Sequence, residues 1–185
     1  AGGVPARTVQ HSPIGLRHAG FLCAGVECEI AVRLAEDLPA RDTPYTRDVV
    51  ASAVGAVMAA IEVVDDRYLD YRSVDVPTLI ADDFFNAGCV LAPPVESWRE
   101  LDLAGLRGRM WINRREVGQG RGGDVLGHPL EALAWLANSS ALRGRHPRAG
   151  EIVLLGSVVQ TVWVEAGDLV EVEIEDLGQV SVRFD

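Results

Sequence analysis

The chain has 185 residues, 48% hydrophobic and 24% charged, a composition typical of one globular domain with a sizeable core. Its formal net charge is −10 and no basic stripe is present, which argues against a nucleic-acid partner. No apolar run approaches the roughly 20 residues of a membrane-spanning helix, and the start A-G-G-V-P-A-R does not resemble a signal peptide. We therefore expect a cytoplasmic protein that binds neither nucleic acid nor membrane. Lysine does not occur, so these residues supply no Schiff-base or general-base lysine.

The first 20 residues are rich in Gly, Pro, Arg and His and show little periodicity, so they are expected to form a loop or a loosely held arm. The three cysteines, Cys23, Cys28 and Cys89, form no C-x-x-C pair. An odd number of cysteines without such a motif indicates free, mostly buried thiols in a reducing compartment.

The first predicted strand covers residues 26–34, where apolar and charged residues alternate. Successive side chains of a strand point to opposite faces, so one face is expected to enter the core. That face carries Val26, Cys28, Ile30, Val32 and Leu34. The other face carries Glu27, Glu29, Ala31 and Arg33. The two carboxylates therefore point the same way, with Cα atoms roughly 6.5–7 Å apart.

A helix is predicted next, because apolar residues recur at helical spacing from Val49 to Ile61 and Thr43 or Thr46 can cap its start. A short strand over 61–64 follows and ends in Asp65 and Asp66. Residues 70–77 have the composition of a loop. Residues 79–90 fit neither the helical spacing nor the alternation of a strand.

Most of the elements predicted in the second half of the chain are strands. A strand is expected at residues 109–113 and a hairpin turn at 113–116. A helix is expected from Leu130 to about Leu142, because Pro129 suits its first turn. Further strands are expected at 151–156, 161–164, 169–175 and 179–184, with turns at 165–168 and 176–178. No repeat or linker divides the chain, so we predict one β-rich α+β domain with two or three helices.

Two like charges on one strand face repel, and either strong solvation or a cation must offset that repulsion. The pair Glu27 and Glu29 therefore has two interpretations: a solvated outer face, or a site for a hard divalent ion such as Mg²⁺ or Mn²⁺, which prefers carboxylate oxygens. Glu62, Asp65 and Asp66 are the candidates for a third ligand.

The stretch G-V-E-C-E-I-A-V-R-L-A-E-D-L-P resembles the metal-binding strand of the fumarylacetoacetate hydrolase superfamily. It is most similar to the branch of 2-keto-4-pentenoate hydratases and 4-oxalocrotonate decarboxylases. Four further blocks extend the resemblance from about residue 25 to 184. These are A-I-E-V-V-D-D-R-Y (60–68), L-I-A-D-D-F-F-N-A-G-C-V-L (79–91), G-H-P-L-E-A-L-A-W-L-A-N (127–138), and the closing strands that begin A-G-E-I-V-L-L-G-S-V-V-Q (149–160).

The resemblance implies a fumarylacetoacetate hydrolase-like mixed β-sandwich roll. It implies a catalytic domain over residues 25–185, preceded by an N-terminal arm (residues 1–24) or the remnant of a longer segment. Glu27, Glu29 and Glu62 match the family's three metal-ligating carboxylates, which implies Mg²⁺ or Mn²⁺ as the cofactor. The implied activity is a hydratase (hydro-lyase) that acts on a 2-hydroxy-2,4-dienoate or similar 2-oxo acid, as in the catabolism of aromatic compounds. Alternatives are a decarboxylase of the 4-oxalocrotonate type, a C–C hydrolase of acylpyruvates, and a non-catalytic metal-binding homologue.

Four further residues match family positions near the site or lie beside them. His128 and Asp82 are candidates for proton transfer, and Ser157 and Asp83 for substrate binding; a structural role for His128 and a turn role for Ser157 are the alternatives. The resemblance also implies a homo-oligomer and makes a complex with a related hydratase or decarboxylase subunit conceivable.

The chain departs from the family pattern in two places. Relatives carry an upstream segment whose lysine and acidic residue take part in proton transfer, and that segment is not part of this sequence. We therefore expect the chain to bind 2-oxo acids through its metal but to turn over a dienoate poorly. The second departure is the loop at 82–88, where Phe84 and Phe85 replace small or polar residues. The two phenylalanines indicate either a better-packed core loop or a more apolar, narrower substrate pocket.

Overall fold

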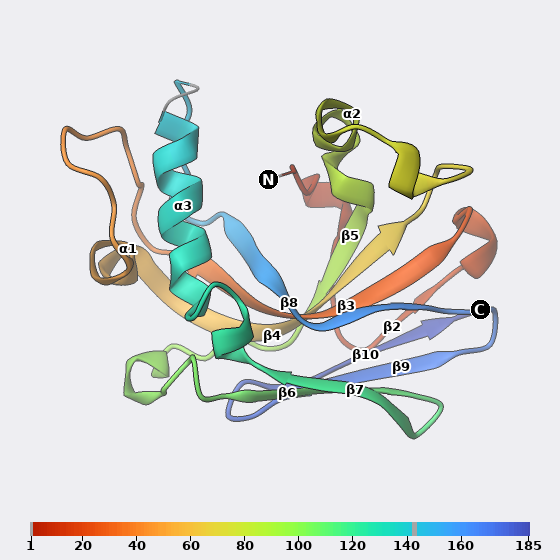
Figure 1. Cartoon of the computed structure of the whole chain (residues 1–185). Coiled ribbons are helices and arrows are strands. Elements are labelled where there is room, and N and C mark those ends of the chain that lie inside the picture. The colour runs from red at the N-terminus through yellow and green to blue at the C-terminus, as the bar shows by residue number, and fades with distance from the viewer. Residues whose placement is uncertain (1, 142–143) are drawn as a thin grey trace.

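The structure is a computed structural model that describes residues 2–141 and 144–185. Within these residues, two five-stranded mixed sheets face each other, and α2 and α3 lie on the side of one sheet that faces away from the other (Figure 1). The α-helices are α1 (Arg47–Ala53), α2 (Val76–Ala81) and α3 (Pro129–Ala141). The predicted β-rich α+β fold with two or three helices is confirmed. Among these helices, none is long and apolar enough to cross a bilayer.

The first sheet, sheet A, has the strand order β1-β5-β4-β3-β8, and the second, sheet B, has the order β2-β10-β9-β6-β7. The strands of sheet A are β1 (Val9–His11), β5 (Asn86–Leu91), β4 (Val54–Asp65), β3 (Ala24–Leu34) and β8 (Ile152–Trp163). Those of sheet B are β2 (Ile14–Leu16), β10 (Gly178–Phe184), β9 (Leu169–Ile174), β6 (Arg107–Ile112) and β7 (Arg115–Arg121). Short 3₁₀ turns connect them: η1 (Ala6–Thr8), η2 (His18–Gly20), η3 (Tyr71–Ser73), η4 (Asp83–Phe85), η5 (Trp98–Glu100) and η6 (Gly122–Asp124).

The main hydrophobic core lies between the two sheets. The predicted inward face of β3, from Val26 to Leu34, is buried there in one cluster with apolar residues of β9 and β10 such as Val172 and Phe184. In β4 the same alternation sends Val57, Ala59, Ile61 and Val63 into this core. The opposite face of sheet A, which α2 and α3 flank, is therefore free to carry Glu27, Glu29 and Glu62 (Figure 1).

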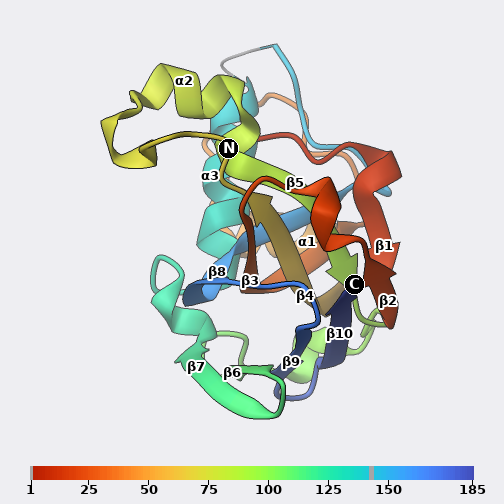
Figure 2. The same cartoon turned by 90° about the vertical axis from the view of Figure 1, so that its right-hand side faces the viewer.

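The expectation of a loop or loosely held arm is wrong for the middle of residues 1–20. Strand β1 pairs in parallel with β5 of sheet A, and β2 pairs in parallel with β10 of sheet B, so the segment ties the two sheets together along one edge (Figure 2). Between them, Ser12 donates its backbone N–H to Leu91 O at 3.1 Å and accepts from Ser181 N at 2.9 Å. The sequence does not predict β1 and β2, because each strand has three residues and is too short to show an alternation of apolar and polar side chains.

The predicted helix through residue 61 is also wrong beyond residue 53. The chain leaves α1 at Ala53 and becomes the 12-residue strand β4, which includes Gly55, Met58 and Ile61. Strand β4 lies between β3 and β5 and is buried on both faces, so apolar residues occupy nearly every position. Such a continuous apolar run also satisfies helical spacing, and periodicity alone cannot distinguish the two.

Two smaller differences and two confirmations concern the other predicted elements. The strands expected at 151–156 and 161–164 are one strand, β8, whose register against β3 shifts three times. Helix α2 and strand β7 carry no strong apolar period and were not predicted. The hairpin turn at Asn113 and Arg114 is confirmed by their left-handed φ angles of 51° and 69°. The helix at Pro129 is confirmed, but its predicted end at Leu142 lies outside the described residues.

Strand β7 approaches β8 closely enough that glycine is required at the contact. A Cβ atom at Gly120 would collide with the backbone oxygen of Val158. We expect Gly120→Ala to lower the free energy of unfolding by about 1–3 kcal/mol, because overpacking forces the two strands apart. Gly20→Ala is the control, since a Cβ there meets nothing within 4 Å; its effect should stay within about 0.5 kcal/mol. Denaturant unfolding of both variants tests this, and equal stabilities would contradict it.

Candidate metal centre

Three glutamates meet on the face of sheet A that points away from sheet B. Glu27 of β3 is the register partner of Glu62 on β4, and Glu29 follows two residues along β3 on the same face. One carboxylate oxygen from each of the three lies within 4.8 Å of the others. Glu29 is 2% exposed, whereas Glu27 and Glu62 are half-buried. Strand pairing alone thus assembles a compact set of three hard oxygen ligands.

A neutral donor holds one oxygen of each carboxylate. The pairs are Thr161 Oγ1 to Glu27 Oε1, Gly156 N to Glu29 Oε2 (2.9 Å) and Asn86 Nδ2 to Glu62 Oε1 (2.7 Å). Each carboxylate is thereby oriented by a neutral donor at one of its oxygens. Donors of this kind, which orient a ligand without binding the ion, are a regular feature of metal sites.

The electrostatics of the cluster require a proton or a cation. Burial chiefly raises the pKa of Glu27; the hydrogen bond from Thr161 opposes this rise, and the charge of Glu62 adds to it. Burial raises the pKa of Glu29 well above its usual range, and the nearby charge of Glu62 raises it further. No arginine or histidine of the described residues forms an ion pair with any of the three glutamates. The residues present therefore fit a divalent ion, which would offset the repulsion.

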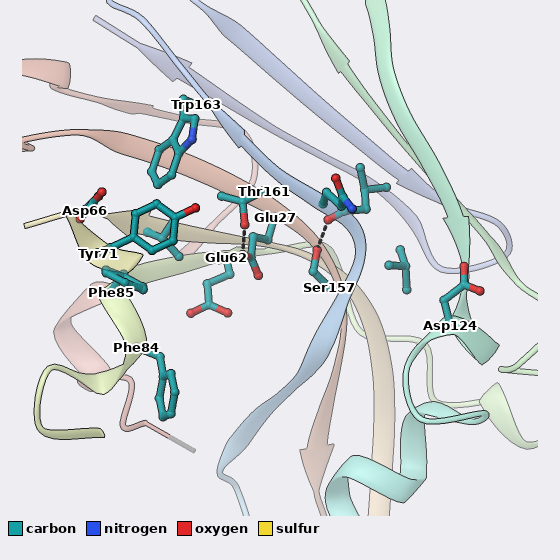
Figure 3. Close-up of a pocket in the computed structure, with 14 residues that line it drawn as sticks. Glu27, Glu62, Asp66, Tyr71, Phe84, Phe85, Asp124, Ser157, Thr161 and Trp163 are labelled. Atoms are coloured by element: carbon teal, nitrogen blue, oxygen red, sulfur yellow. Dashed lines mark hydrogen bonds between the residues drawn. The ribbon is translucent and has the colours of Figure 1, made fainter. Parts of the chain in front are cut away.

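Glu27 and Glu62 open onto a cavity of about 750 Å³ (Figure 3). Strand β8 forms one wall with Ser157, Thr161 and Trp163, and the turn η4 contributes Phe84 and Phe85. The remaining lining residues are Val64, Asp66, Tyr71, Asp124, Val158, Val159 and Gln160. A cavity of this size beside a metal cluster can hold a small organic acid.

The aromatic wall of η4 depends on an unusual backbone. Asp83, Phe84 and Phe85 all have left-handed φ angles, of 55°, 54° and 67°. This conformation costs roughly 1–2 kcal/mol per non-glycine residue, so neighbouring contacts must compensate. The Asp82 carboxylate accepts from Phe85 N at 3.1 Å, and Arg67 donates to Asp82 Oδ1 at 2.9 Å. Arg67 also donates to the backbone oxygens of Phe85 and of the next residue, Asn86.

Asp82 and Asp83 form structural hydrogen bonds and do not line the cavity. Asp83 accepts from the backbone N–H of Gly3 at 2.7 Å, and Asp82 holds η4 as described. Ser157 does line the cavity, and its hydroxyl lies within hydrogen-bond distance of two backbone oxygens, those of Cys28 (3.2 Å) and Val159, to one of which it donates its single proton. The proposed roles of these three residues in catalysis or substrate binding stay predictions.

His128 lies directly before α3 and is not among the residues that line the cavity. Its Nδ1 accepts from the backbone N–H of Leu130 at 3.1 Å, a contact that caps the helix. Burial, and next the charge of Arg47, lowers the pKa of His128, so the ring is neutral near pH 7. Its role in proton transfer likewise stays a prediction.

Sequence reasoning did not identify Asn86, Thr161, Tyr71 or Trp163 as residues of this site. Asn86 and Tyr71 lay in segments without a clear period, and Thr161 and Trp163 were assigned to a separate strand. The alternation of Ser157, Thr161 and Trp163 along one strand face is the signal that could have found the β8 wall. Of the other acids, Asp66 lines the cavity, whereas Asp65 accepts from the backbone N–H groups of Leu22 and Cys23, both at 2.8 Å.

The thiols agree with the expectation of free cysteines. Cys23 is exposed, and Cys28 and Cys89 are buried. Burial, together with the charge of Glu29, raises the pKa of Cys28 to about 12. Burial and the charges of Glu62 and Glu29 raise the pKa of Cys89 to about 12. Both buried thiols are therefore protonated in the metal-free protein, and neither belongs to the cluster of three glutamates.

The fold and the site place the protein in one class, the β-sandwich rolls with a three-carboxylate centre. Comparisons with known proteins identify its family. A sequence profile of the fumarylacetoacetate (FAA) hydrolase C-terminal family matches residues 6–185. The chain belongs to this family. It is 36% identical over 174 residues to 2-hydroxyhexa-2,4-dienoate hydratase of Comamonas testosteroni, covering 92% of this chain and 64% of that protein. It is 35% identical over 159 residues to 4-oxalocrotonate decarboxylase of Pseudomonas putida, covering 86% and 59%.

A solved structure of the same branch is also similar. The 4-oxalocrotonate decarboxylase of Pseudomonas putida G7, complexed with magnesium and adipate, superposes with a TM-score of 0.89 at 29% identity. The match covers 97% of this chain and 67% of that one. The chain thus spans about three-fifths of the length of the two curated relatives, 64% and 59%.

The buried charge of Glu29 yields a first prediction for the metal-free protein. Glu29→Gln keeps an oxygen that can accept from Gly156 N and removes the charge. We expect the free energy of unfolding at pH 7 to rise by about 1–3 kcal/mol without metal, since the buried carboxyl of the wild type must either carry an unpaired charge or take up a proton well above its ordinary pKa. Added Mg²⁺ should then stabilise the wild type but not the variant. Thermal unfolding with and without Mg²⁺ measures both effects.

The exposed Glu165 provides the control for that experiment, because Glu165→Gln removes the same charge from a turn. It should change neither the metal-free stability nor the response to Mg²⁺. A Glu29→Gln protein that is less stable than the wild type without metal would contradict the prediction.

The raised pKa of Glu29 and Glu27 predicts that metal binding is linked to pH. Below about pH 4 the carboxylates are protonated in both folded and unfolded states, so their burial carries no electrostatic cost. As pH rises above that value, the unfolded chain ionises first, and the metal-free fold loses stability. Mg²⁺ must displace the retained protons, so its affinity should rise as the pH increases above the ordinary range of a glutamate pKa. Calorimetry in buffers of different ionisation enthalpy would detect the released protons; pH-independent affinity without release would refute the linkage.

Proposed function

We propose that this chain is the metal- and substrate-binding part of a divalent-metal-dependent hydratase that adds water to a 2-hydroxy-2,4-dienoate or related 2-oxo acid. The observation that carries the proposal is the cluster of Glu27, Glu29 and Glu62 at the wall of a 750 Å³ cavity. Relatives named 2-hydroxyhexa-2,4-dienoate hydratase (36% identity) and 2-keto-4-pentenoate hydratase (37% identity) support the choice of reaction.

The three glutamates would hold Mg²⁺ or Mn²⁺, because each offers a hard oxygen ligand and the cavity leaves room for water and substrate. The magnesium in the related decarboxylase structure supports this assignment. When bound, the ion would polarise the keto group of a 2-oxo acid and stabilise the enolate-like charge that develops. The donors Thr161 and Asn86 would keep the Glu27 and Glu62 carboxylates in position during this step.

The proton transfers need a group within hydrogen-bond reach, which typically contributes about 10²–10⁴-fold to the rate. Asp66 and Asp124 line the cavity, and Ser157 offers a hydroxyl beside Glu27. His128 and Asp82 are retained as candidate proton carriers, which would have to reach the cavity through bound water. The rest of a longer protein can supply further groups, because the relatives exceed this chain in length.

A metal-dependent decarboxylase of the 4-oxalocrotonate type is the second candidate. The superposition with that enzyme, at a TM-score of 0.89, favours it. In this reaction the same polarised keto group would accept the electrons left by departing CO₂. We further propose self-association, and a complex with a related hydratase or decarboxylase subunit, as the assembly in which either reaction takes place.

The metal ligands can be tested by calorimetric titration with Mn²⁺. Glu27→Gln keeps the shape of the side chain and removes one ligand charge, so the fold should survive while Mn²⁺ affinity falls by about tenfold or more. Glu165→Gln serves as the matched control and should bind Mn²⁺ like the wild type. Unchanged affinity in Glu27→Gln would eliminate this site.

Turnover can be followed as loss of the ultraviolet absorbance of 2-hydroxypenta-2,4-dienoate in the presence of Mg²⁺. We expect slow turnover by residues 1–185 and, if the gene encodes an upstream segment, faster turnover by the version that includes it. Both rates should depend on Mg²⁺ and fall in Glu27→Gln. Turnover that persists in chelator would rule out the metal-dependent mechanism.

A further inference from the structure

The cavity has a chemically distinct outer half next to the glutamates. Gly25 lies two residues before Glu27 on the same face of β3, roughly 6.5–7 Å along the strand, and pairs with Trp163 of β8. A Cβ on Gly25 would lie 2.8 Å from Cε3 of the Trp163 ring and 2.9 Å from Val64 Cγ2. The missing side chain of Gly25 therefore makes room for the indole ring against the sheet, within one strand repeat of the metal ligands.

Aromatic rings from another part of the chain complete this outer half. Phe85 packs edge-on against Tyr71 at a centroid distance of 6.0 Å and against Tyr68 at 5.7 Å. Phe84, Phe85, Tyr71 and Trp163 all line the cavity, and Figure 3 shows Trp163, Tyr71 and Phe85 together on one side of Glu27 and Glu62. Trp163, Tyr71 and Phe84 remain 46%, 40% and 38% exposed. Partly exposed aromatic rings around a cavity are surfaces that an apolar ligand can cover.

The charges that face this cavity are all negative among the described residues. Besides Glu27 and Glu62, the lining includes Asp66 beside the aromatic wall and Asp124 at the other end (Figure 3). Two arginines lie near the aromatic wall, but both contact other groups. Arg67 is bound to Asp82 and to backbone oxygens, and Arg72 stacks on the Tyr71 ring at 5.4 Å; neither lines the cavity. A second carboxylate on a substrate would meet Asp66 rather than a cationic partner.

We propose that the site selects 2-oxo acids whose distal end is neutral and apolar, and disfavours those with a second, distal carboxylate. This inference rests on the proposed function, in which the glutamate-bound metal holds the carboxylate and keto group of the substrate. The distal carbons would then lie over Trp163, Tyr71 and Phe85, where each buried methylene strengthens binding roughly fourfold. Selectivity of this kind favours the hydratase over 4-oxalocrotonate decarboxylation, because 4-oxalocrotonate carries a carboxylate at both ends.

Three saturated 2-oxo acids separate the contributions: pyruvate, 2-oxohexanoate and 2-oxoadipate. The last two share one carbon chain and differ only in a terminal methyl or carboxylate group. Titration calorimetry of the Mg²⁺-loaded chain should give 2-oxohexanoate, which has three more methylenes, an affinity at least about tenfold higher than pyruvate and at least about tenfold higher than 2-oxoadipate. This measurement requires binding and no turnover.

Two variants assign the effect to residues. Trp163→Ala should weaken 2-oxohexanoate about fivefold or more and leave pyruvate within about twofold, since aromatic contacts act on the distal carbons alone. Trp135→Ala removes an equally exposed indole from α3, outside the cavity, and should change neither affinity. Asp66→Asn should strengthen 2-oxoadipate several-fold more than it strengthens pyruvate, because the removed charge faces the distal carboxylate.

The outcomes distinguish this inference from the function on which it rests. Mg²⁺-dependent binding of pyruvate, with 2-oxoadipate bound as tightly as 2-oxohexanoate, would overturn the inference and leave the metal site standing. Mg²⁺-independent binding of all three acids would overturn both. A Trp163→Ala protein that retains the wild-type preference for 2-oxohexanoate would also overturn the inference.

Discussion

The pairing of β3 with β4 is the constraint on which the rest of this structure depends. It sets Glu27 opposite Glu62 and leaves Glu29 two residues further along the same face, so three carboxylates share one small region. The other face of the same strands is committed to the core between the sheets. A register shift of one residue would exchange the two faces and bury the charges in that core. The need to keep Val26 and Ile30 inside therefore also holds the glutamates together.

Around this cluster, each neighbouring element supplies one kind of support. Strand β8 contributes Thr161 and Gly156 as donors through a register that shifts along β3, and β5 begins at Asn86, the donor to Glu62. The left-handed turn η4 precedes Asn86 directly, so the contacts of Arg67 that stabilise the turn also position this amide. Ligand orientation and the aromatic wall of the cavity thus depend on the same short segment.

Under the proposed function, the two halves of the cavity would serve two different purposes. The glutamate-bound metal would hold the part of a 2-oxo acid that all members of the class share, whereas Trp163, Tyr71 and Asp66 line the half that would face the part that differs. Gly25 links the two halves, because its lack of a side chain admits the indole ring on the strand that carries Glu27 and Glu29. Changes in η4 and at the end of β8 would then alter the substrate while β3 and β4 keep the glutamate cluster.

The sequence by itself determined the β-rich class, the two faces of β3, the closing strands and the three candidate ligands, because alternation and the block resemblance are local signals. It did not determine β4, since a strand buried on both faces is apolar at nearly every position and looks like a helix. Nor did it determine the roles of β1, β2, Asn86 or Thr161, which depend on pairing with strands far along the chain. Only the tertiary structure decided that Asp82 and His128 hold backbone groups outside the cavity while Trp163 and Asp66 line it. The physical reason is that these positions follow from strand register and long-range packing, which the local pattern of one segment does not specify.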